Sequence, residues 1–532
     1  MQMKQMKICL FLFLMPLLFC GLVAGEVVYR CDFSPDGLKG WRLGGIATTE
    51  KTPDGYVLKI TAAADKAHNK ISLPLNLAPW SGKILRMSCK MKLDDVTKPK
   101  HKWNGSKFML VWRQGPNGTR QFRHPEGRFG TTDWLEVVHH AVVGPNPTSG
   151  SLQLGLEESK GTIRFRDLKL ELLELTEVYP AVAPAGARAV YTDRVSRAPR
   201  RRGAMSPSRF RNTVISKDLP DLRSWGVNLI RWQLIRNWNK VGDNRNVEEY
   251  LAWVEGRIPE VQQVLDKAHQ LGMKVVLDLH VAPGGRRANG EMEMFYNRKY
   301  ADAFLEAWRR LAQAVKGHPA LYGYDLINEP KQHPGAPIDY LALQYEAAKV
   351  VRAIDPETPL IIEANDMASP QEFSYLHVLP LKDVIYQVHM YKPGSYTHQG
   401  VRKSPLTGRY PGKINNAEWN KESLREALRP VREFQLKYGA KIYVGEFSAI
   451  RWAPGGAQYL EDCLSLFEEY GWDWSYHAFR EWSGWSVEHT SDRNNPDPSP
   501  VDTDRKKVLI KYLKLNDEKG LKNEHQFTGE SE

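Results

Sequence analysis

The 532-residue sequence predicts an antiparallel β-sandwich followed by a (β/α)8 barrel, and two patterns lead to this prediction. From about Glu26 to Val178, short strand-like runs follow one another with turn signals between them and no long helical pattern. From about residue 188 to 515, apolar strands alternate with amphipathic helices, which is typical of parallel β/α units. The chain is therefore expected to contain two structural units joined by a linker.

Residues 1–25 have the pattern of a secretory signal peptide. Lys4 and Lys7 precede the apolar stretch ICLFLFLMPLLFCGLV, and small residues for cleavage follow it. A membrane anchor is the alternative, but Pro16 and Gly21 interrupt the stretch, which is also short for a spanning helix. We expect a secreted protein, extracellular or periplasmic, with no membrane span. Removal of the two lysines lowers the formal net charge from +12 to +10.

The sandwich, expected over residues 26–178, is predicted from six strand-like runs, several of which alternate with period two. The runs cover residues 56–64, 83–93, 107–114, 134–143, 151–158 and 161–175. Turn signals such as PDG, PNG and PTSG separate them. Cys31 and Cys89 lie in this region and are candidates for a disulfide. The segment YPAVAPAGA, residues 179–187, breaks the pattern and predicts a linker.

Residues 188–515 supply the strands and helices of the barrel. Seven apolar strands are expected at residues 227–234, 273–280, 321–328, 359–365, 383–391, 441–449 and 473–479, and RRGAMSP (201–207) supplies an eighth, first in order. Helical patterns lie between them, and a last one, residues 504–515, precedes a polar tail, residues 516–532. An open doubly wound sheet is the alternative fold. No glycine-rich phosphate loop follows an early strand, which argues against a nucleotide site.

Polar and aromatic residues gather where these strands end. In a (β/α)8 barrel the carboxyl ends of the strands meet at one rim, and function is found there. The residues at this rim are expected to be Arg231, His280, Asn328, Glu329, Glu363, Asn365, His389, Tyr391, Glu446, His477, Phe479, Arg480, Glu481, Trp482 and Trp485. None has the short ligand spacing of a dedicated metal site, and no cofactor is expected.

Two carboxyls of this set, Glu329 and Glu446, end the fourth and the seventh strand and are expected to face each other across the barrel mouth. Opposed carboxyls are what glycoside hydrolysis requires: one protonates the leaving oxygen, and the other attacks the anomeric carbon or activates water. Asn328 is expected to donate to the substrate 2-hydroxyl. Arg231 is expected to hold the attacking carboxyl ionised by lowering its pKa, and Tyr391 to hydrogen-bond that carboxyl and place its ring near the reacting sugar. The acid needs a raised pKa and partial desolvation. His280 and His389 are expected to bond sugar hydroxyls or the acid.

The motifs NLIRW, LDLH, LINEP, VHMY and VGEF, in this order and on these strands, resemble family 5 glycoside hydrolases, the cellulase-type retaining β-glycosidases. The resemblance implies a (β/α)8 barrel in which Glu329 is the acid/base and Glu446 the nucleophile. It also implies a sugar-stacking tryptophan after the eighth strand. Here Phe479 stands near that place and Trp482 and Trp485 follow, so Phe479 and Trp482 are the expected aromatic contacts.

The N-terminal region, chiefly in GTIRFRDLKLELLEL, resembles jelly-roll carbohydrate-binding modules. Trp41, Trp80, Trp103, Trp112 and Trp134 are available for stacking on sugar rings, although a purely structural domain is the alternative.

The sequence therefore predicts a secreted, monomeric retaining glycoside hydrolase that cleaves β-linked polysaccharide or oligosaccharide. A transglycosylase with the same residues is one alternative, and a non-catalytic carbohydrate-binding protein is another. A third alternative, an enzyme that acts on acidic polymers, is supported only by the net charge. Much of that charge comes from seven arginines between Arg194 and Arg211. The sequence contains no zinc-finger spacing, no RNA-binding signature and no basic amphipathic helix, so a nucleic-acid partner is not expected.

Overall fold

The computed structural model describes residues 25–65, 69–101, 103–113, 120–125, 127–144, 146–147, 149–174, 182–207, 214–236, 244–333, 336–401 and 404–517. The predicted signal peptide, except its last residue, and most of the predicted polar tail lie outside these ranges. Part of the predicted linker, residues 182–187, lies within them.

The C-terminal unit is a closed barrel of eight parallel strands, which confirms the predicted fold. The strands, in barrel order, are β11 (Arg202–Pro207), β12 (Leu229–Gln233), β13 (Lys274–Asp278), β14 (Leu321–Asp325), β15 (Leu360–Glu363), β16 (Val384–Met390), β19 (Lys441–Phe447) and β20 (Asp473–Tyr476). The RRGAMSP segment is the first of them, as predicted. The strands β12, β14, β15 and β16 are buried along their whole length, as expected when helices cover the outside of a parallel sheet.

Side chains that point into the barrel form an apolar layer with a polar layer above it. The apolar layer consists of Leu229, Val276, Tyr322, Ile361, Ile385 and Tyr443. Because strand side chains alternate between the two faces, the next inward-facing positions lie two residues further along each strand. These positions place Arg231, Asp278, Glu363 and Gln387 toward the carboxyl ends of their strands. The alternation of the sequence thus builds a polar floor under the barrel mouth.

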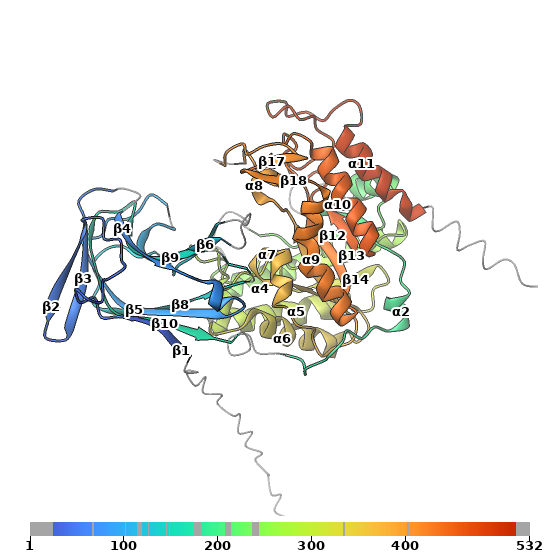
Figure 1. Ribbon diagram of the computed structural model, residues 1–532. Coiled ribbons are helices and arrows are strands. Elements are labelled where there is room, and N and C mark those ends of the chain that lie inside the picture. Colours follow the sequence, from blue (N-terminus) through green and yellow to red (C-terminus); the bar gives the residue numbers. More distant parts are fainter. Residues whose placement is uncertain are drawn as a thin grey trace, which may run out of the picture.

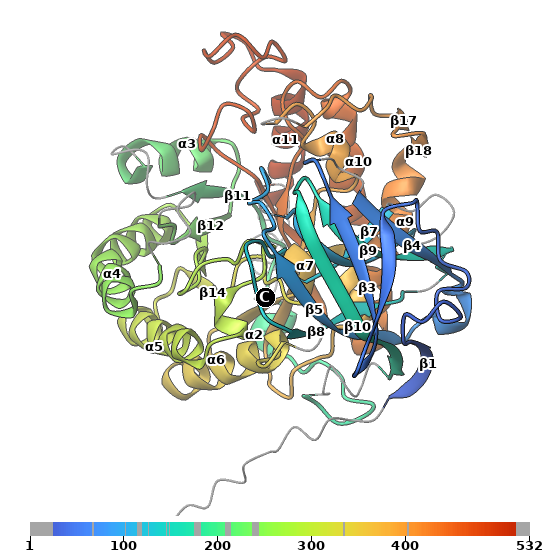
Figure 2. The same ribbon diagram turned by 90° about the vertical axis from the view of Figure 1, so that its left-hand side faces the viewer.

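Helices surround the strands and close a second apolar core outside the barrel (Figure 2). The longer ones are α4 (Val247–Gln270), α5 (Arg298–Val315), α6 (Tyr340–Ile354), α9 (Lys421–Tyr438), α10 (Gly456–Tyr470) and α11 (Asp504–Leu513), with the shorter α2 (Asp193–Ser196), α3 (Leu219–Ser224), α7 (Asn365–Ala368) and α8 (Gly394–Thr397). Polar caps define several starts: Asn246, Asp339 and Asn420 accept backbone N–H groups of α4, α6 and α9. A short hairpin, β17 (Gly412–Ile414) with β18 (Ala417–Trp419), lies after β16.

The N-terminal unit is made of two antiparallel sheets facing each other, as predicted. One sheet has the order β2-β3-β10-β5-β8 with β1 beside β10, and the other has the order β4-β9-β6-β7. The strands are β1 (Glu26–Cys31), β2 (Ala47–Thr52), β3 (Gly55–Ala62), β4 (Asn69–Leu75), β5 (Ile84–Asp94), β6 (Gly105–Arg113), β7 (Arg120–Arg123), β8 (Leu135–Val142), β9 (Gly150–Glu157) and β10 (Gly161–Leu173). The strands β1, β2, β4 and β7 were not among the six predicted runs. β2 and β7 are polar edge strands, so they lack the apolar pattern that reveals a strand.

Cys31 and Cys89 are both buried in the sandwich core, but they do not form the disulfide for which they were candidates. The Cys31 thiol donates to the carbonyl of Gly37 at 3.2 Å. Burial raises the pKa of both thiols, so neither is prepared to react as a thiolate.

The two units pack against each other through β5, β8 and β10 (Figure 1). Ile84 and Leu173, at one end of the sandwich, belong to the same buried apolar cluster as the outer core of the barrel, and Val142 packs against it. His139 of β8 also interacts electrostatically with His333, which follows β14.

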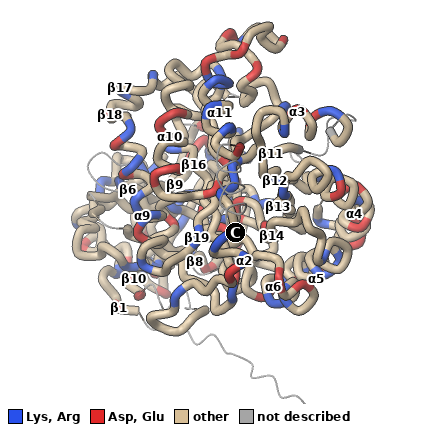
Figure 3. Tube along the Cα trace, turned by 90° about the vertical axis from the view of Figure 1, so that its right-hand side faces the viewer, with Lys and Arg blue, Asp and Glu red and all other residues tan. Residues whose placement is uncertain are grey.

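Charge and hydropathy add two observations about the described residues. No helix among them combines the length and apolar character needed to cross a membrane. On the side of the barrel away from the sandwich, basic and acidic residues are interspersed along the outer helices (Figure 3), so the basic excess is not gathered there.

Candidate active site

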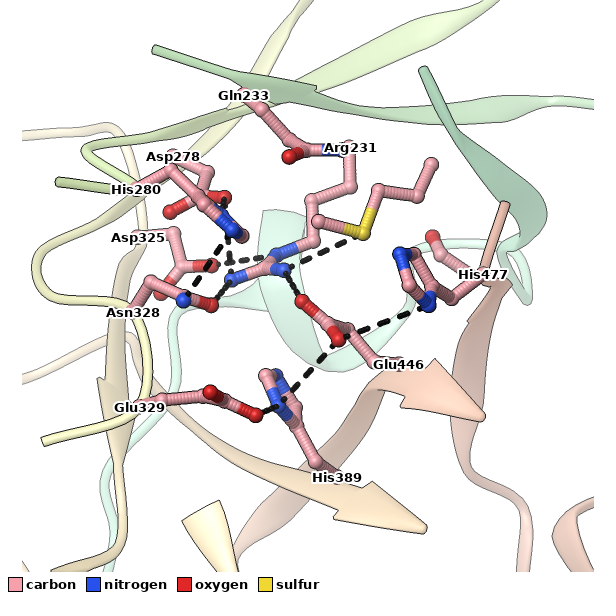
Figure 4. Close-up of polar contacts among 12 residues, drawn as sticks. Arg231, Gln233, Asp278, His280, Asp325, Asn328, Glu329, His389, Glu446 and His477 are labelled. Atoms are coloured by element: carbon pink, nitrogen blue, oxygen red, sulfur yellow. Dashed lines mark hydrogen bonds and ion pairs between the residues drawn. The ribbon is translucent and has the colours of Figure 1, made fainter. Parts of the chain in front are cut away.

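One guanidinium group lies at the centre of the polar layer (Figure 4). Arg231 has no exposed surface, and four carboxyl groups surround it. Its Nε donates to Asp325 Oδ2 at 2.8 Å, and its Nη1 donates to Glu446 Oε1 at 2.7 Å. Its Nη2 lies 3.2 Å from Asp278 Oδ2 and 3.0 Å from Glu363 Oε1. Four acidic groups therefore share one permanent cation.

This imbalance of charge perturbs the acidic groups. Burial, opposed by Arg231 and reinforced by Asp278, raises the pKa of Asp325 to about 6. Burial and the neighbouring Asp325 raise the pKa of Glu363 well above its ordinary value. Asp325 and Glu363 therefore bind protons at a higher pH than exposed carboxyls would.

Glu446, at the end of β19, is shifted in the opposite direction from Asp325 and Glu363 and stays ionised. Burial alone would raise its pKa, but His389, His477, Arg231 and His280 outweigh burial and hold it well below the ordinary value. Both carboxylate oxygens have donors, because Arg231 binds Oε1 and the Tyr391 hydroxyl donates to Oε2 at 2.9 Å. A charged, oriented carboxylate in a barrel mouth has the properties of a nucleophile.

Glu329 follows β14 in a left-handed backbone conformation, with φ of 52°. Its N–H donates to Glu363 Oε2 at 2.6 Å, and its carbonyl accepts from Arg286 Nη2 at 2.8 Å. These bonds on both sides of the residue hold a conformation that L-residues rarely adopt. Glu363 and Arg286 therefore aim the Glu329 side chain into the barrel mouth.

The raised pKa expected for Glu329 is not found. Burial and the charge of Glu446 raise this pKa, but the hydrogen bond from His389, with the charges of His389 and Arg286, brings the net value below the ordinary one. His389 Nδ1 lies 3.3 Å from Glu329 Oε1. An imidazole beside the carboxyl was expected from the sequence, but its effect on the pKa was not.

The remaining predicted polar residues converge on the same group. Asn328 accepts from Arg231 Nη2 at 3.0 Å, and its Nδ2 lies 3.4 Å from His280 Nε2. His280 Nδ1 lies 2.7 Å from Asp278 Oδ2, which orients the imidazole. The structure therefore brings together Arg231, His280, Asn328, Glu329, His389, Tyr391 and Glu446.

The two predicted aromatic contacts have different surroundings. Phe479 is 4% exposed and packs edge-on against Trp225 at 5.1 Å between ring centroids, among apolar residues rather than beside the glutamates. Trp482 is 44% exposed. Its ring lies 5.9 Å from that of Trp485, which in turn lies 6.2 Å from the ring of Tyr391. Trp482 is therefore the aromatic residue that is both open to solvent and connected to the site.

Several site residues were missed by sequence reasoning. Asp278, Asp325 and Gln387 belong to the polar layer, and Trp452 lies edge-on to Trp482 at 6.0 Å. An acidic residue inside an otherwise apolar strand, as in VVLDLH and YDLINE, was the available signal for the two aspartates.

Among the described residues, one group has ligand atoms close enough to hold a metal ion: Glu329, His389 and Glu446, all within 4.8 Å of one another. Arg231 and Tyr391 already donate to both oxygens of Glu446. The guanidinium thus supplies the positive charge that a cation would bring. The arrangement is suited to acid–base and nucleophilic chemistry by the side chains themselves.

Comparisons with known proteins agree with this geometry. The family model for cellulase (glycosyl hydrolase family 5) matches residues 204–485. Endoglucanase C of Acetivibrio thermocellus is 28% identical over 302 residues, covering 51% of this chain and 86% of that protein. Cellodextrinase A of Ruminococcus flavefaciens is 23% identical over 295 residues, covering 54% and 82%.

Two solved structures are similar to part of the chain at low identity. Subunit Z of the clostridial cellulose synthase from Clostridioides difficile has a TM-score of 0.46 at 20% identity, covering 59% of this chain and all of that one. Endoglucanase Cel5A of Thermotoga maritima has a TM-score of 0.42 at 22% identity, covering 56% and 89%. The family match over more than half of the chain shows that the protein belongs to glycosyl hydrolase family 5, the cellulase family, and is a glycoside hydrolase acting on O-glycosyl bonds.

Proposed function

We propose that the protein hydrolyses a β-glucan with retention of anomeric configuration, with Glu446 as nucleophile and Glu329 as acid/base. The observation that carries the proposal is the short separation of the two carboxyls, which have oxygens within 4.8 Å of each other. Retaining glycosidases keep the two groups about 5–5.5 Å apart, whereas inverting enzymes leave about 6.5–9.5 Å for a water molecule. The small gap favours direct attack by Glu446 over attack by an interposed water.

In the first step, a carboxylate oxygen of Glu446 bonds to the anomeric carbon, the bond to the leaving oxygen breaks, and Glu329 gives that oxygen its proton. In the second step, Glu329 takes a proton from water, the water oxygen bonds to the anomeric carbon, and the ester to Glu446 breaks. The charge of Glu446 raises the pKa of Glu329. Formation of the ester removes that charge and so lowers the pKa of Glu329. Glu329 is then ionised and can take a proton from water in the second step.

The neighbouring residues support these roles. Arg231 and Tyr391 keep Glu446 ionised and oriented. Asn328, held by Arg231, is the proposed partner of the substrate 2-hydroxyl, and His280 and His389 are the proposed partners of sugar hydroxyls or of the acid. The exposed ring of Trp482, rather than the buried Phe479, is suited to stack on a pyranose ring.

The substrate class comes from the relatives, which include an endoglucanase and a cellodextrinase. Residues 1–25 are proposed to direct secretion, and residues 179–187 to link a carbohydrate-binding module, 26–178, to the catalytic unit, 188–515. Within the module Trp103 is 52% exposed and available for sugar stacking, whereas Trp41 and Trp112 are buried. No cofactor is needed, and the enzyme is proposed to act as a monomer without a nucleic-acid partner.

The test is release of reducing sugar from a panel of β-glucans, mannans and xylans. Wild type should release sugar from a β-glucan, whereas Glu329→Gln and Glu446→Gln should each lose at least about a hundredfold in kcat, the lower range for a positioned acid or base. Glu426→Gln, on the exposed face of α9, is the matched control and should keep full activity.

The anomer of the first product, followed by NMR, tests the stereochemistry. The β-anomer should form first, and early formation of the α-anomer would show inversion. Binding of a glucan without release by wild type would instead identify a non-catalytic carbohydrate-binding protein. Longer products formed with added acceptor would identify a transglycosylase.

A further inference from the structure

A chain of three polar groups, Tyr391, His477 and Glu481, runs away from the carboxylate oxygen of Glu446 that Arg231 does not bind. The Tyr391 hydroxyl donates to Glu446 Oε2 at 2.9 Å, and the Tyr391 hydroxyl oxygen lies 2.6 Å from His477 Nδ1. The other ring nitrogen of His477, Nε2, lies 3.0 Å from Glu481 Oε2. His477 directly follows the eighth strand (Figure 4), and its Nδ1 lies 4.0 Å from Glu446 Oε2. His477 has so far been named only for its effect on the pKa of Glu446, and Glu481 has been given no role.

The number of protons in this chain determines the charge of His477. A tyrosine hydroxyl has one proton, so it can donate to only one of its two neighbours. Glu446 is held ionised by Arg231 and can only accept hydrogen bonds. The Tyr391 hydroxyl therefore uses its one proton for the hydrogen bond to Glu446. The short contact between Tyr391 and His477 then requires a proton on Nδ1, and the contact with Glu481 requires one on Nε2. An imidazole with both protons is an imidazolium cation.

The surroundings of His477 fit a cation. Two carboxylates face it, Glu446 and Glu481, against the positive charge of Arg231. His398 also faces it, and burial with His477 lowers the pKa of His398, so that His398 stays neutral. Burial alone would lower the pKa of His477, but Glu446 and Glu481 outweigh burial and raise it.

Glu481 in turn stays ionised and is held in place. Burial would raise its pKa, but His477 and His280 lower the net value. Gln233 Nε2 donates to the same carboxylate oxygen at 3.4 Å. The ring of Trp485, 5.5 Å from that of His477, covers the chain on a further side.

We propose that His477 is a positioning residue that Glu481 holds as an imidazolium. The imidazolium directs the hydrogen bond of the Tyr391 hydroxyl toward Glu446 and so keeps the nucleophile oriented and charged. This inference rests on the proposed role of Glu446. When His477 loses its proton at high pH, the Tyr391 hydroxyl can turn to Nδ1. Glu446 then loses one of its two donors and a nearby positive charge, and the rate of its attack falls. Protonation of His477 therefore sets an alkaline limit on the attack step.

The first test isolates the attack step with 2,4-dinitrophenyl β-cellobioside. This leaving group departs without a proton from Glu329, so kcat/KM reports the nucleophile side of the free enzyme. Glu481→Gln keeps the shape and removes the charge that faces Nε2. The alkaline limb of its kcat/KM profile against pH should move to lower pH by about 1–3 units, because one opposite charge at this distance shifts a pKa by about that amount. Glu488→Gln, in the same loop but paired with Arg480 at 2.9 Å, is the matched control and should leave the limb in place.

The second test does not depend on activity. The protein is labelled in its 15 histidines, and the His477 signal is identified by its loss in His477→Asn. In an NMR titration the His477 pKa should lie above about 6.5 in wild type, fall by at least about one unit in Glu481→Gln, and stay unchanged in Glu488→Gln.

A His477 pKa at or below about 6.5 in wild type, or an equal value in Glu481→Gln, would overturn the proposal. An unmoved alkaline limb in an active Glu481→Gln enzyme would do the same. If wild type releases no dinitrophenol but the titrations behave as expected, the proposed reaction fails while the imidazolium assignment stands.

Discussion

Replacement of Arg231 by methionine would remove the guanidinium that contacts four carboxyls of the polar layer. Asp278, Asp325, Glu363 and Glu446 all lie within 3.2 Å of the guanidinium, and none of them is more than slightly exposed. Loss of one partner from a buried ion pair costs about 3–5 kcal/mol, because the remaining charge is left without compensation. Since a domain is stable by only about 5–15 kcal/mol, Arg231→Met should lose a large part of the free energy of unfolding.

The loss should depend on pH, and its sign follows from the acids that remain. Asp325 already has a pKa of about 6 beside Arg231, and removal of the cation raises it further. When the pKa of an acid is higher in the folded than in the unfolded state, the fold loses stability as pH rises from the unfolded pKa to the folded pKa. Each unit of additional shift adds about 1.4 kcal/mol at neutral pH. The variant should therefore be closest to wild type near about pH 5 and furthest from it near about pH 7.5.

The assay is urea unfolding of wild type and Arg231→Met at these two pH values, followed by tryptophan fluorescence. Arg429→Met is the matched control, because Arg429 pairs with Glu426 and Glu433 on the surface of α9 with a half-exposed side chain. It should cost less than about 1 kcal/mol. An equal loss by Arg231→Met at both pH values, or a gain in stability, would refute the uncompensated-carboxyl reasoning.

Three further predictions concern the aromatic residues and the junction of the two units. Trp482→Ala should weaken binding of a long β-glucan oligosaccharide to the inactive nucleophile variant by about 1 kcal/mol, or about fivefold, measured by calorimetry. Phe479→Ala should leave that affinity unchanged but lower the free energy of unfolding by about 3–5 kcal/mol, since its ring fills a core beside Trp225. Stability should fall as pH drops from about 6.5 toward 4, because burial lowers the pKa of His139 and brings that of His333 to about 4, so the unfolded chain binds more protons. His139→Phe should flatten this dependence in scanning calorimetry, and a slope equal to that of wild type would contradict the assignment.

The barrel and the placement of its acidic pair could be predicted because they depend on local patterns. A continuous apolar strand followed by an amphipathic helix needs no distant information, and eight such units close into a barrel. Glu329 and Glu446 end two of these strands, so the barrel rule alone predicts that they face one mouth. The first strand, Arg202–Pro207, was found by the same counting.

The balance of charge beneath the mouth depended on closure of the barrel. Asp278 and Asp325 are single acids inside apolar strands, and only the inward direction of both side chains brings them to Arg231. The pKa of Glu329 shows the same dependence. A desolvated acid was expected to have a raised pKa, but the positions of His389 and Arg286, contributed by other segments, reverse the sign.

The chain order of residues after the eighth strand did not show which ring faces the substrate. Phe479 and Trp482 are three residues apart, yet one packs into the core and the other faces solvent. Patterns repeated along one segment were thus enough for strands, helices and the positions where they end. Side-chain direction in a loop, pKa values and hydrogen-bond partners are set by distances between segments far apart in the chain, because Coulomb energy and burial depend on those distances and not on sequence separation.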